Sequence, residues 1–376
     1  MNILKELLWE KKMFDWKKYV TIESKKQKDD LPIQIGNSIV VDGYLPDKKN
    51  AVFTHFHHDH MARIDDALDY DKILVHQYTY DVAIALKRTR KFRKNLKPVN
   101  YGQTYTTKFG EDITLYDADH ILGSAQVHVK VDNTRILYSG DFLFPSADTP
   151  KCDILILDAT HGSPQFEIPT DRGSVLRGLL KMVKEKLFDK THPQSIIITA
   201  DEGIMQEIMN FLDKGTQEDN IFGDIPFIAN SDDIKIKNAL YGIDSKFGRN
   251  FHDASSPEAY HIKKYKSKCI VFTTKLEITD PYLQHMFHVI VDKYANFHNE
   301  PNISEHKKEE IVQGKKETTT MLRINLLSHS TYSGILDYVE RNEPKVVLLD
   351  SSRSKQSVKL ASDITKKFTI PGISLP

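Results

Sequence analysis

A histidine-rich run follows a short apolar segment near residue 50, and it constrains this 376-residue chain more than any other feature. The apolar residues are 51–53, and the run reads Thr54-His55-Phe56-His57-His58-Asp59-His60. If a strand ends before the run, His55 and His57, two positions apart, can turn their imidazoles to the same side. Asp59 and His60 then lie beyond the bend and face a second position.

Imidazole and carboxylate groups suit zinc, manganese or iron, and catalytic sites of this kind leave one position open for water. A histidine-rich surface loop is the alternative interpretation. The acidic residue inside the run and the apolar segment before it favour a metal site.

Composition limits the class of protein. With 40% apolar residues, the chain can bury one large core or two of medium size. Its 52 basic and 52 acidic residues balance, so any surface for a polyanion must be local. The two cysteines, Cys152 and Cys269, exclude a disulfide framework and cysteine-rich zinc sites. No segment has the length of a membrane span or the character of a signal peptide, so we expect a cytoplasmic protein with no membrane partner.

The hydrophobic pattern predicts strands first and α/β alternation later. Residues 32–42 are typical of a hairpin across Gly36-Asn37. A helix is predicted over 81–96, and the polar segment 296–319 is predicted to be a loop or a poorly ordered linker. The other predicted strands are 73–75, 113–116, 126–131, 135–138, 154–157, 195–199, 269–273, 323–327 and 346–349, and the other predicted helices are 172–187, 203–212 and 332–341.

Further candidate ligands stand where predicted strands end. His120 lies in a turn eased by Gly123, Asp141 follows Gly140, and His329 follows the strand at 323–327. Each alone is more often a hydrogen-bonded turn residue. Together with the first run they complete a binuclear set, in which one metal takes His55, His57 and His120 and the other takes Asp59, His60 and His329, with Asp141 bridging. Asp42, also at a strand end, is predicted to orient a ligand histidine or the adjacent loop rather than to bind metal.

Such a ligand set predicts hydrolytic chemistry. Two divalent ions about 3.5–4 Å apart can share a water, lower its pKa and hold it as hydroxide. The carboxylates of Asp59 and Asp141 neutralise only part of the metal charge. The remaining positive charge suits an anionic ester, and a phosphodiester is the natural match.

Basic residues within 86–97 are the best candidate for binding a nucleic-acid backbone. A solvated basic helix is an equally good interpretation. A second lysine cluster, at 263–268, is weaker because short lysine runs are ordinary surface. The predicted nucleic-acid contacts are Lys87, Arg88, Arg90, Lys91, Arg93 and Lys94.

The ligand pattern resembles the signature of the metallo-β-lactamase superfamily. Residues 120–125, His-Ile-Leu-Gly-Ser-Ala, are similar to the His-x-Leu-Gly-Ser-Ala element of its β-CASP branch, the nucleases that include the cleavage-and-polyadenylation endonuclease and Artemis-type DNA nucleases. The resemblance implies an αββα sandwich built from residues 1–170 and 321–376. It also implies an inserted α/β β-CASP domain at 171–320.

The resemblance also implies roles for single residues. Asp158 maps to the first β-CASP motif and His329 to the second, while Asp350 stands at the third position, where other members have His or Val. Ile204 replaces the arginine of the family's Gly-Arg-x-Gln-Glu, so a phosphate contact is missing or supplied elsewhere. His161 is as well explained by a structural loop as by catalysis. The catalytic candidates are Asp59, Asp158, His329 and Asp350.

The predicted function is a metal-dependent nuclease that hydrolyses phosphodiester bonds of RNA or single-stranded DNA with a hydroxide held by two divalent ions. RNA processing is the favoured setting, and zinc is the expected metal, with manganese or iron as alternatives. Three other functions stay open: a thioester or lactone hydrolase of the same fold, a DNA-repair exonuclease of the same branch, and a nucleic-acid-binding subunit with an inactive metal site.

Overall fold

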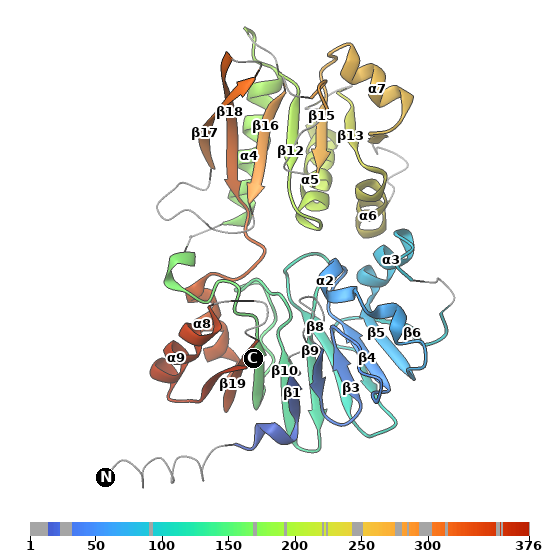
Figure 1. Ribbon diagram of the computed structural model, residues 1–376, viewed down its shortest axis with the longest axis vertical. Coiled ribbons are helices and arrows are strands. Elements are labelled where there is room, and N and C mark those ends of the chain that lie inside the picture. Colours follow the sequence, from blue (N-terminus) through green and yellow to red (C-terminus); the bar gives the residue numbers. More distant parts are fainter. Residues whose placement is uncertain are drawn as a thin grey trace. The chain divides into compact units, whose positions relative to one another are not determined.

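The chain of this computed structural model divides into two units, one from both ends of the chain and one from its middle (Figure 1). The first unit comprises Met1–Glu167 and His329–Pro376, and the second comprises Ile168–Ser328, so it extends beyond the boundary at 320 expected from the sequence. The structure describes residues 14–22, 32–89, 93–167, 171–191, 194–219, 222, 225–242, 251–274, 280–283, 286–292, 303–312, 315–350, 354 and 356–375, without the side chains of 215–219, 292, 303–312, 315–320 and 350.

The first unit contains a six-stranded sheet whose strands follow the order of the chain. The predicted hairpin is present, because Ile33–Ile35 pairs antiparallel with Ile39–Val41, and Gly36 takes the positive φ of +62° that the turn requires. From β3 to β6 the strands are parallel, so their carboxyl ends meet at one edge of the sheet. The strands are β1 (Val20–Ile22), β2 (Ile33–Ile35), β3 (Ile39–Val41), β4 (Asn50–Phe53), β5 (Lys72–His76) and β6 (Leu96–Val99).

A seven-stranded sheet with the order β20-β19-β11-β10-β9-β8-β7 completes the first unit. The interior strand β11 is buried at all four positions, which is typical of a strand covered on both faces. Because β19 pairs with β11, the last part of the chain is an integral part of this sheet. The strands are β7 (Thr104–Thr106), β8 (Asp112–Asp117), β9 (Ala125–Val131), β10 (Thr134–Tyr138), β11 (Ile154–Leu157), β19 (Val346–Asp350) and β20 (Gly372–Leu375).

Two apolar layers hold the first unit together. One core joins the two sheets, with Leu74 packed in the same cluster as Val127 and Ile156. The other core lies between the seven-stranded sheet and its helices, with Ile335 and Ile364 as buried members. The remaining elements are η1 (Trp16–Lys18), α2 (His58–Met61), η2 (Ile64–Asp66), α3 (Gln77–Ala85), η3 (Pro164–Phe166), α8 (Tyr332–Asn342) and α9 (Ser357–Phe368). With α3 against β5 and β6, this arrangement confirms the expected αββα layers.

The helix predicted over 81–96 is wrong in its second half. The helix α3 begins after His76, whose side chain accepts from the Tyr78 backbone N–H, and it ends at Ala85. Lys87 then takes a left-handed φ of +56°, which an α-helix cannot continue through. The chain enters the strand β6 at Leu96, so the described basic residues Lys87, Arg88, Arg93 and Lys94 lie on a connection rather than around a helix.

The second unit is built around one seven-stranded sheet with the order β14-β13-β15-β12-β16-β18-β17. All neighbouring strands pair in parallel except the β17–β18 hairpin. Its strands are β12 (Ile196–Thr199), β13 (Phe227–Ala229), β14 (Phe251–Asp253), β15 (Ile270–Thr273), β16 (Phe287–Asp292), β17 (Ile303–Val312) and β18 (Lys315–Asn325), and its helices are α4 (Arg172–Leu187), α5 (Ile204–Asp219), α6 (Ser231–Tyr241) and α7 (Pro257–Lys264). In the described parts of both units, no helix is long and apolar enough to span a membrane.

The segment 296–319, predicted to be a loop or linker, instead contributes strands wherever the structure describes it. The strand β17 pairs antiparallel with β18 over ten positions, and β18 pairs with β16. Backbone pairing with a neighbouring strand holds a polar segment in a sheet even where its side chains give no apolar signal. That contribution is absent from a sequence-based prediction.

Candidate metal centre

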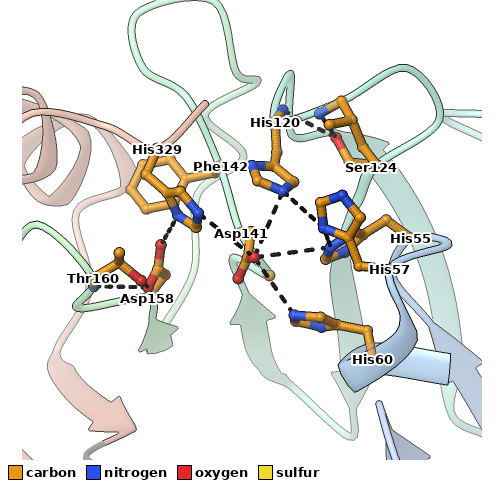
Figure 2. Close-up of polar contacts among 12 residues, drawn as sticks. His55, His57, His60, His120, Ser124, Asp141, Phe142, Asp158, Thr160 and His329 are labelled. Atoms are coloured by element: carbon orange, nitrogen blue, oxygen red, sulfur yellow. Dashed lines mark hydrogen bonds and ion pairs between the residues drawn. The ribbon is translucent and has the colours of Figure 1, made fainter. Parts of the chain in front are cut away.

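Three histidine rings and one carboxylate converge within the first unit (Figure 2). His55 Nε2 lies 3.0 Å from His57 Nδ1, which lies 3.3 Å from His120 Nε2. Asp141 Oδ2 lies 3.8 Å from His55 Nε2 and 3.7 Å from His120 Nε2. The donor atoms of this group all lie within 4.8 Å of one another, which suits a single ion held among them.

A second set of donors shares the same aspartate. Asp141 Oδ2 lies 3.5 Å from His60 Nε2 and 3.9 Å from His329 Nε2. Asp59 Oδ2 lies 3.6 Å from His60 Nε2, and its side chain is 62% exposed, so solvent reaches the centre on that side. Asp141 Oδ2 therefore lies near ring nitrogens of both sets (Figure 2).

The donors come from the ends of strands. His55 follows β4 across Thr54, and Asp141 follows β10 across Ser139 and Gly140. Gly140 has a φ of +55°, and a Cβ there would lie 3.1 Å from the Ala125 carbonyl oxygen and 3.3 Å from Thr54 Cγ2. A side chain at this position would therefore displace the turn that carries Asp141.

His120 lies in the loop between β8 and β9, which its own hydrogen bonds fix. Ser124 Oγ accepts from the backbone N–H groups of His120, at 3.0 Å, and Ile121, at 3.3 Å. Gly123 has a φ of +88°, and a Cβ there would lie 2.6 Å from Tyr78 Cβ. The loop is therefore closely packed against the start of α3.

Hydrogen bonds through Asp42 and Thr54 connect a ring of the first donor set with a ring of the second. Asp42 Oδ2 accepts from Thr54 Oγ1 at 2.8 Å and lies 2.7 Å from His60 Nδ1, while Asp42 Oδ1 accepts from the Thr54 backbone N–H at 2.8 Å. Thr54 Oγ1 lies 3.0 Å from His55 Nδ1. These contacts place the Nδ1–H of each ring against an acceptor, so Nε2 of both rings can face an ion. Asp42 adopts a left-handed φ of +48°, which its hydrogen bonds offset.

Asp158 orients His329 in the same way. Its Oδ2 lies 2.9 Å from His329 Nδ1, and its Oδ1 accepts from Thr160 N and Thr160 Oγ1. Three hydrogen bonds, one with His329 and two with Thr160, thus fix this carboxylate (Figure 2). His161 Nδ1 lies 3.1 Å from the Ser330 carbonyl oxygen, and its ring stacks on Phe166 with the centroids 4.7 Å apart.

Burial and neighbouring charges set the protonation states. Desolvation, then the proximity of His60 and His57, holds the pKa of His55 well below its usual value. Burial alone would raise the pKa of Asp141, but His60 and His329 outweigh it and hold the pKa well below the ordinary value. Burial, then His329, lowers the pKa of His161 to about 4.

These states fit a metal centre. The neutral imidazole of His55 and the ionised carboxylate of Asp141 are the forms that bind divalent cations. His55, His60 and His120 are each at most 2% exposed, so their clustered nitrogens are buried within the unit and are not part of a surface tract. The described residues can therefore hold divalent metal.

The remaining predicted site residues either contact other parts of the unit or have side chains that the structure does not describe. Asp350 ends the strand β19, but its side chain is outside the described part, as are Arg90 and Lys91. Arg88 donates to the Phe56 carbonyl oxygen. Arg93 donates to the Ile64 carbonyl oxygen at 2.7 Å and to Asp65 Oδ1 at 3.2 Å, and its side chain is buried.

Thr54 is the residue that the sequence interpretation missed. Its only sequence signal is its place directly before His55. A hydroxyl that bonds to a carboxylate and a ring nitrogen is recognisable only when the partners' positions are known.

The chain is similar in sequence to several known proteins. No protein-family model matches the chain. The RNase J-like protein of Methanocaldococcus jannaschii is 24% identical over an alignment that covers 85% of this chain and 85% of that protein. The Integrator complex subunit 11 homolog of Dictyostelium discoideum is 21% identical and covers 85% of this chain, which spans about half (51%) of that relative's length.

A solved structure shares the fold. It is a protein of unknown function from Enterococcus faecalis V583, which superposes with a TM-score of 0.61 at 12% identity. The superposition covers 95% of this chain and 97% of that one. At this identity, the likeness is one of fold alone.

Proposed function

This chain is a β-CASP member of the metallo-β-lactamase superfamily, and from that membership we propose that it is a metal-dependent nuclease that cleaves RNA phosphodiester bonds. The observation that carries the proposal is the convergence of five histidines and Asp141 on two adjacent donor sets. The names of its relatives, RNase J-like protein and Integrator complex subunit 11, support RNA processing as the setting.

We propose that His55, His57 and His120 hold one ion and that Asp59, His60 and His329 hold the other, with Asp141 between them. The nitrogen-rich donor sets favour zinc, with manganese or iron as alternatives. Bound there, two divalent ions supply an activated water and offset the charge that gathers on the phosphate.

The surrounding side chains have positioning roles. The Asp158 carboxylate accepts from His329 Nδ1–H and so directs Nε2 towards Asp141. Asp42 does the same for His60. Asp59 stands on the exposed side of the centre, where substrate can approach. Proton transfer by Asp158, His329 or Asp350 remains part of the proposal.

The connection after α3 contributes the proposed contacts to the nucleic-acid backbone. Lys87 and Lys94 are exposed there, whereas the contacts of Arg88 and Arg93 tie the connection to the rest of the unit. We therefore propose Lys87 and Lys94 as phosphate contacts, and we assign Arg88 and Arg93 a structural role in addition to the predicted one. Removing a lysine that contacts phosphate weakens binding to all sequences alike.

One assay tests the function. Purified protein loaded with zinc is incubated with end-labelled single-stranded RNA and DNA, each with a 5′-phosphate or a 5′-hydroxyl. We expect cleavage of RNA, and a loss of more than about 100-fold in Asp59→Ala, whose exposed side chain is not needed for folding. The matched control is Asp69→Ala, another exposed aspartate of the first unit.

Two results would contradict the proposal. Equal cleavage by wild type and Asp59→Ala would remove Asp59 from the centre. Turnover of thioester or lactone substrates without cleavage of any oligonucleotide would replace the nuclease by a small-molecule hydrolase of the same fold.

A further inference from the structure

The second unit carries exposed aromatic side chains interleaved with lysines at the end of α7. The helix α7 packs inward through Ala259, which is fully buried, and Ile262, which contacts the same apolar cluster. Its outer side exposes Tyr260, at 44%, and the following turn exposes Tyr265, at 68%. Tyrosines are enriched where proteins meet partners, so two exposed rings close together on one helix end make this surface a candidate contact site.

A lysine ammonium lies between the two rings. Lys264 Nζ lies 5.5 Å from the centroid of Tyr260 and 5.8 Å from that of Tyr265. The His261 ring stacks on Tyr265 with the centroids 5.8 Å apart, and Lys266 follows with a left-handed φ of +52°. We call these five residues, Tyr260, His261, Lys264, Tyr265 and Lys266, the α7 patch.

The turn that carries the patch is held in place. The backbone N–H of Tyr265 donates to the His261 carbonyl oxygen at 3.0 Å, and that of Lys266 donates to the Lys263 carbonyl oxygen at 3.2 Å. The Ser256 side chain caps the helix start by accepting from Ala259 N. The rings therefore sit on a fixed helix end, and ordering them costs little when a ligand binds.

The charges of the patch are available to an anion. Lys263 lies beside it and is neutralised by Asp280 at 2.8 Å. In contrast, Lys264, Lys266 and Lys268 form no ion pair with any carboxylate among the described residues. Glu258, in the first turn of α7, is the acidic group on the same helix. The patch thus combines exposed rings with unneutralised ammonium groups.

A second ring and lysine continue this surface. Lys268 Nζ lies 5.6 Å from the centroid of Phe188, a ring that is 46% exposed at the end of α4. The Lys268 side chain therefore joins the turn after α7 to another exposed aromatic ring in the same unit.

We propose that the α7 patch, together with the neighbouring Lys268, binds a single strand of nucleic acid, with bases stacked on Tyr260 and Tyr265 and phosphates at Lys264, Lys266 and Lys268. The proposal rests on the proposed nuclease function, which supplies the ligand class. Aromatic platforms beside a cationic track are how proteins grip single strands without sequence preference, because every base has a stacking face. An acidic protein segment would use the lysines alone, and the experiment separates the two.

The test measures binding to the full-length, zinc-loaded protein by fluorescence anisotropy. The probe is an unstructured, fluorescein-labelled RNA of about 20 nucleotides with phosphorothioate linkages, longer than a typical site of about 4–16 nucleotides. We expect Tyr265→Ala and Lys264→Ala each to weaken binding about tenfold and Tyr265→Phe to bind as wild type. Changing Lys264, Lys266 and Lys268 together to alanine should lower the slope of log affinity against log salt by about 2.

The matched control is the double variant Lys108→Ala/Phe109→Ala in the first unit. It removes a 56% exposed ring and its neighbouring lysine, whose charge Asp71 neutralises at 3.2 Å. Its affinity should stay within about twofold of wild type. Hydrolysis of bis(p-nitrophenyl) phosphate, a diester too small to reach beyond one site, should be unchanged in every patch variant.

Each other outcome overturns the proposal in a distinguishable way. If patch variants bind the RNA as tightly as wild type, the patch is wrong and the nuclease function stands. If the lysine changes weaken binding and Tyr265→Ala does not, the surface is a general anion site, as an acidic peptide would use. If wild type neither binds the RNA nor hydrolyses the small diester, the proposed function fails and the patch with it.

Discussion

A single hydroxyl connects the two halves of the donor cluster. Thr54 Oγ1 donates to Asp42 and lies against His55 Nδ1, while Asp42 lies against His60. We expect Thr54→Val, which keeps the shape and removes the hydroxyl, to lower zinc affinity about 10- to 100-fold, because partners of ligand rings fix ring orientation. Competition with a chromogenic chelator measures the affinity.

Thr54→Ser is the control for this change. Serine keeps the oxygen that bonds to Asp42 and His55, so its zinc affinity should remain close to that of wild type. If Thr54→Val binds zinc as tightly as Thr54→Ser, the hydroxyl has no part in holding the rings.

At the scale of an element, the start of α6 carries a buried acid. Burial, then the charge of Glu202, raises the pKa of Asp233 to about 6 from its ordinary 3.8. The folded state therefore binds this proton more tightly than the unfolded state, so its contribution to stability is largest below pH 4 and is lost as the pH rises through 6.

Asp233→Asn should therefore stabilise the protein by about 1–3 kcal/mol at pH 7 and by little at pH 4. Urea unfolding of both proteins at the two pH values measures the difference, and comparing them cancels the titration of the histidines. A gain that is the same at both pH values would show that the carboxyl charge is not the cause.

The end of α9 holds a β-branched residue in an unfavourable conformation. Thr369 is exposed and has a φ of +57°, a region that costs L-residues about 1–2 kcal/mol. We expect Thr369→Gly to stabilise the protein by about 1 kcal/mol, as glycine does at this position after helices. Denaturant unfolding measures it, and Thr365→Gly, inside the same helix, should destabilise instead.

Sequence alone predicted elements whose own pattern decides their structure. Residues 172–187 form α4 as predicted, and Asp171 caps its first turn by accepting from Gly173 N. The helix predicted over 81–96 is too long because Lys87 turns left-handed and Arg93 donates to the distant Ile64 carbonyl oxygen. The hairpin of β17 and β18 depends on pairing with β16, which a local pattern cannot reveal.

The same distinction applies to the candidate centre. The strand-end positions of His55, His120 and Asp141 follow from the sequence. His55 follows β4 of the six-stranded sheet, whereas His120 and Asp141 follow β8 and β10, which run in the same direction on either side of β9. The hydrogen bonds that support the rings, such as that between Thr54 and His55, depend on atomic positions that are accurate to a few tenths of an ångström. The sequence therefore indicated which donors gather, while their supporting hydrogen bonds required coordinates.

At the scale of the whole molecule, the chain passes twice between the two units. The first unit needs residues after the insert, because β19 lies between β11 and β20 in its sheet and His329 completes the second donor set. The second unit is continuous in sequence and has its own core, in which Leu179, Ile208 and Phe272 are buried.

These connections predict different behaviour for two fragments. Residues 168–328 should fold alone and unfold in one cooperative urea transition, because a continuous sheet with its own core satisfies its backbone and apolar groups internally. Residues 1–167 should show no such transition, since they leave β11 without β19 and expose the face that α8 and α9 cover. Circular dichroism during urea titration measures both. A cooperative transition in 1–167 would show that the first unit folds without the residues that follow the insert. The absence of a transition in 168–328 would show that the second unit does not fold alone.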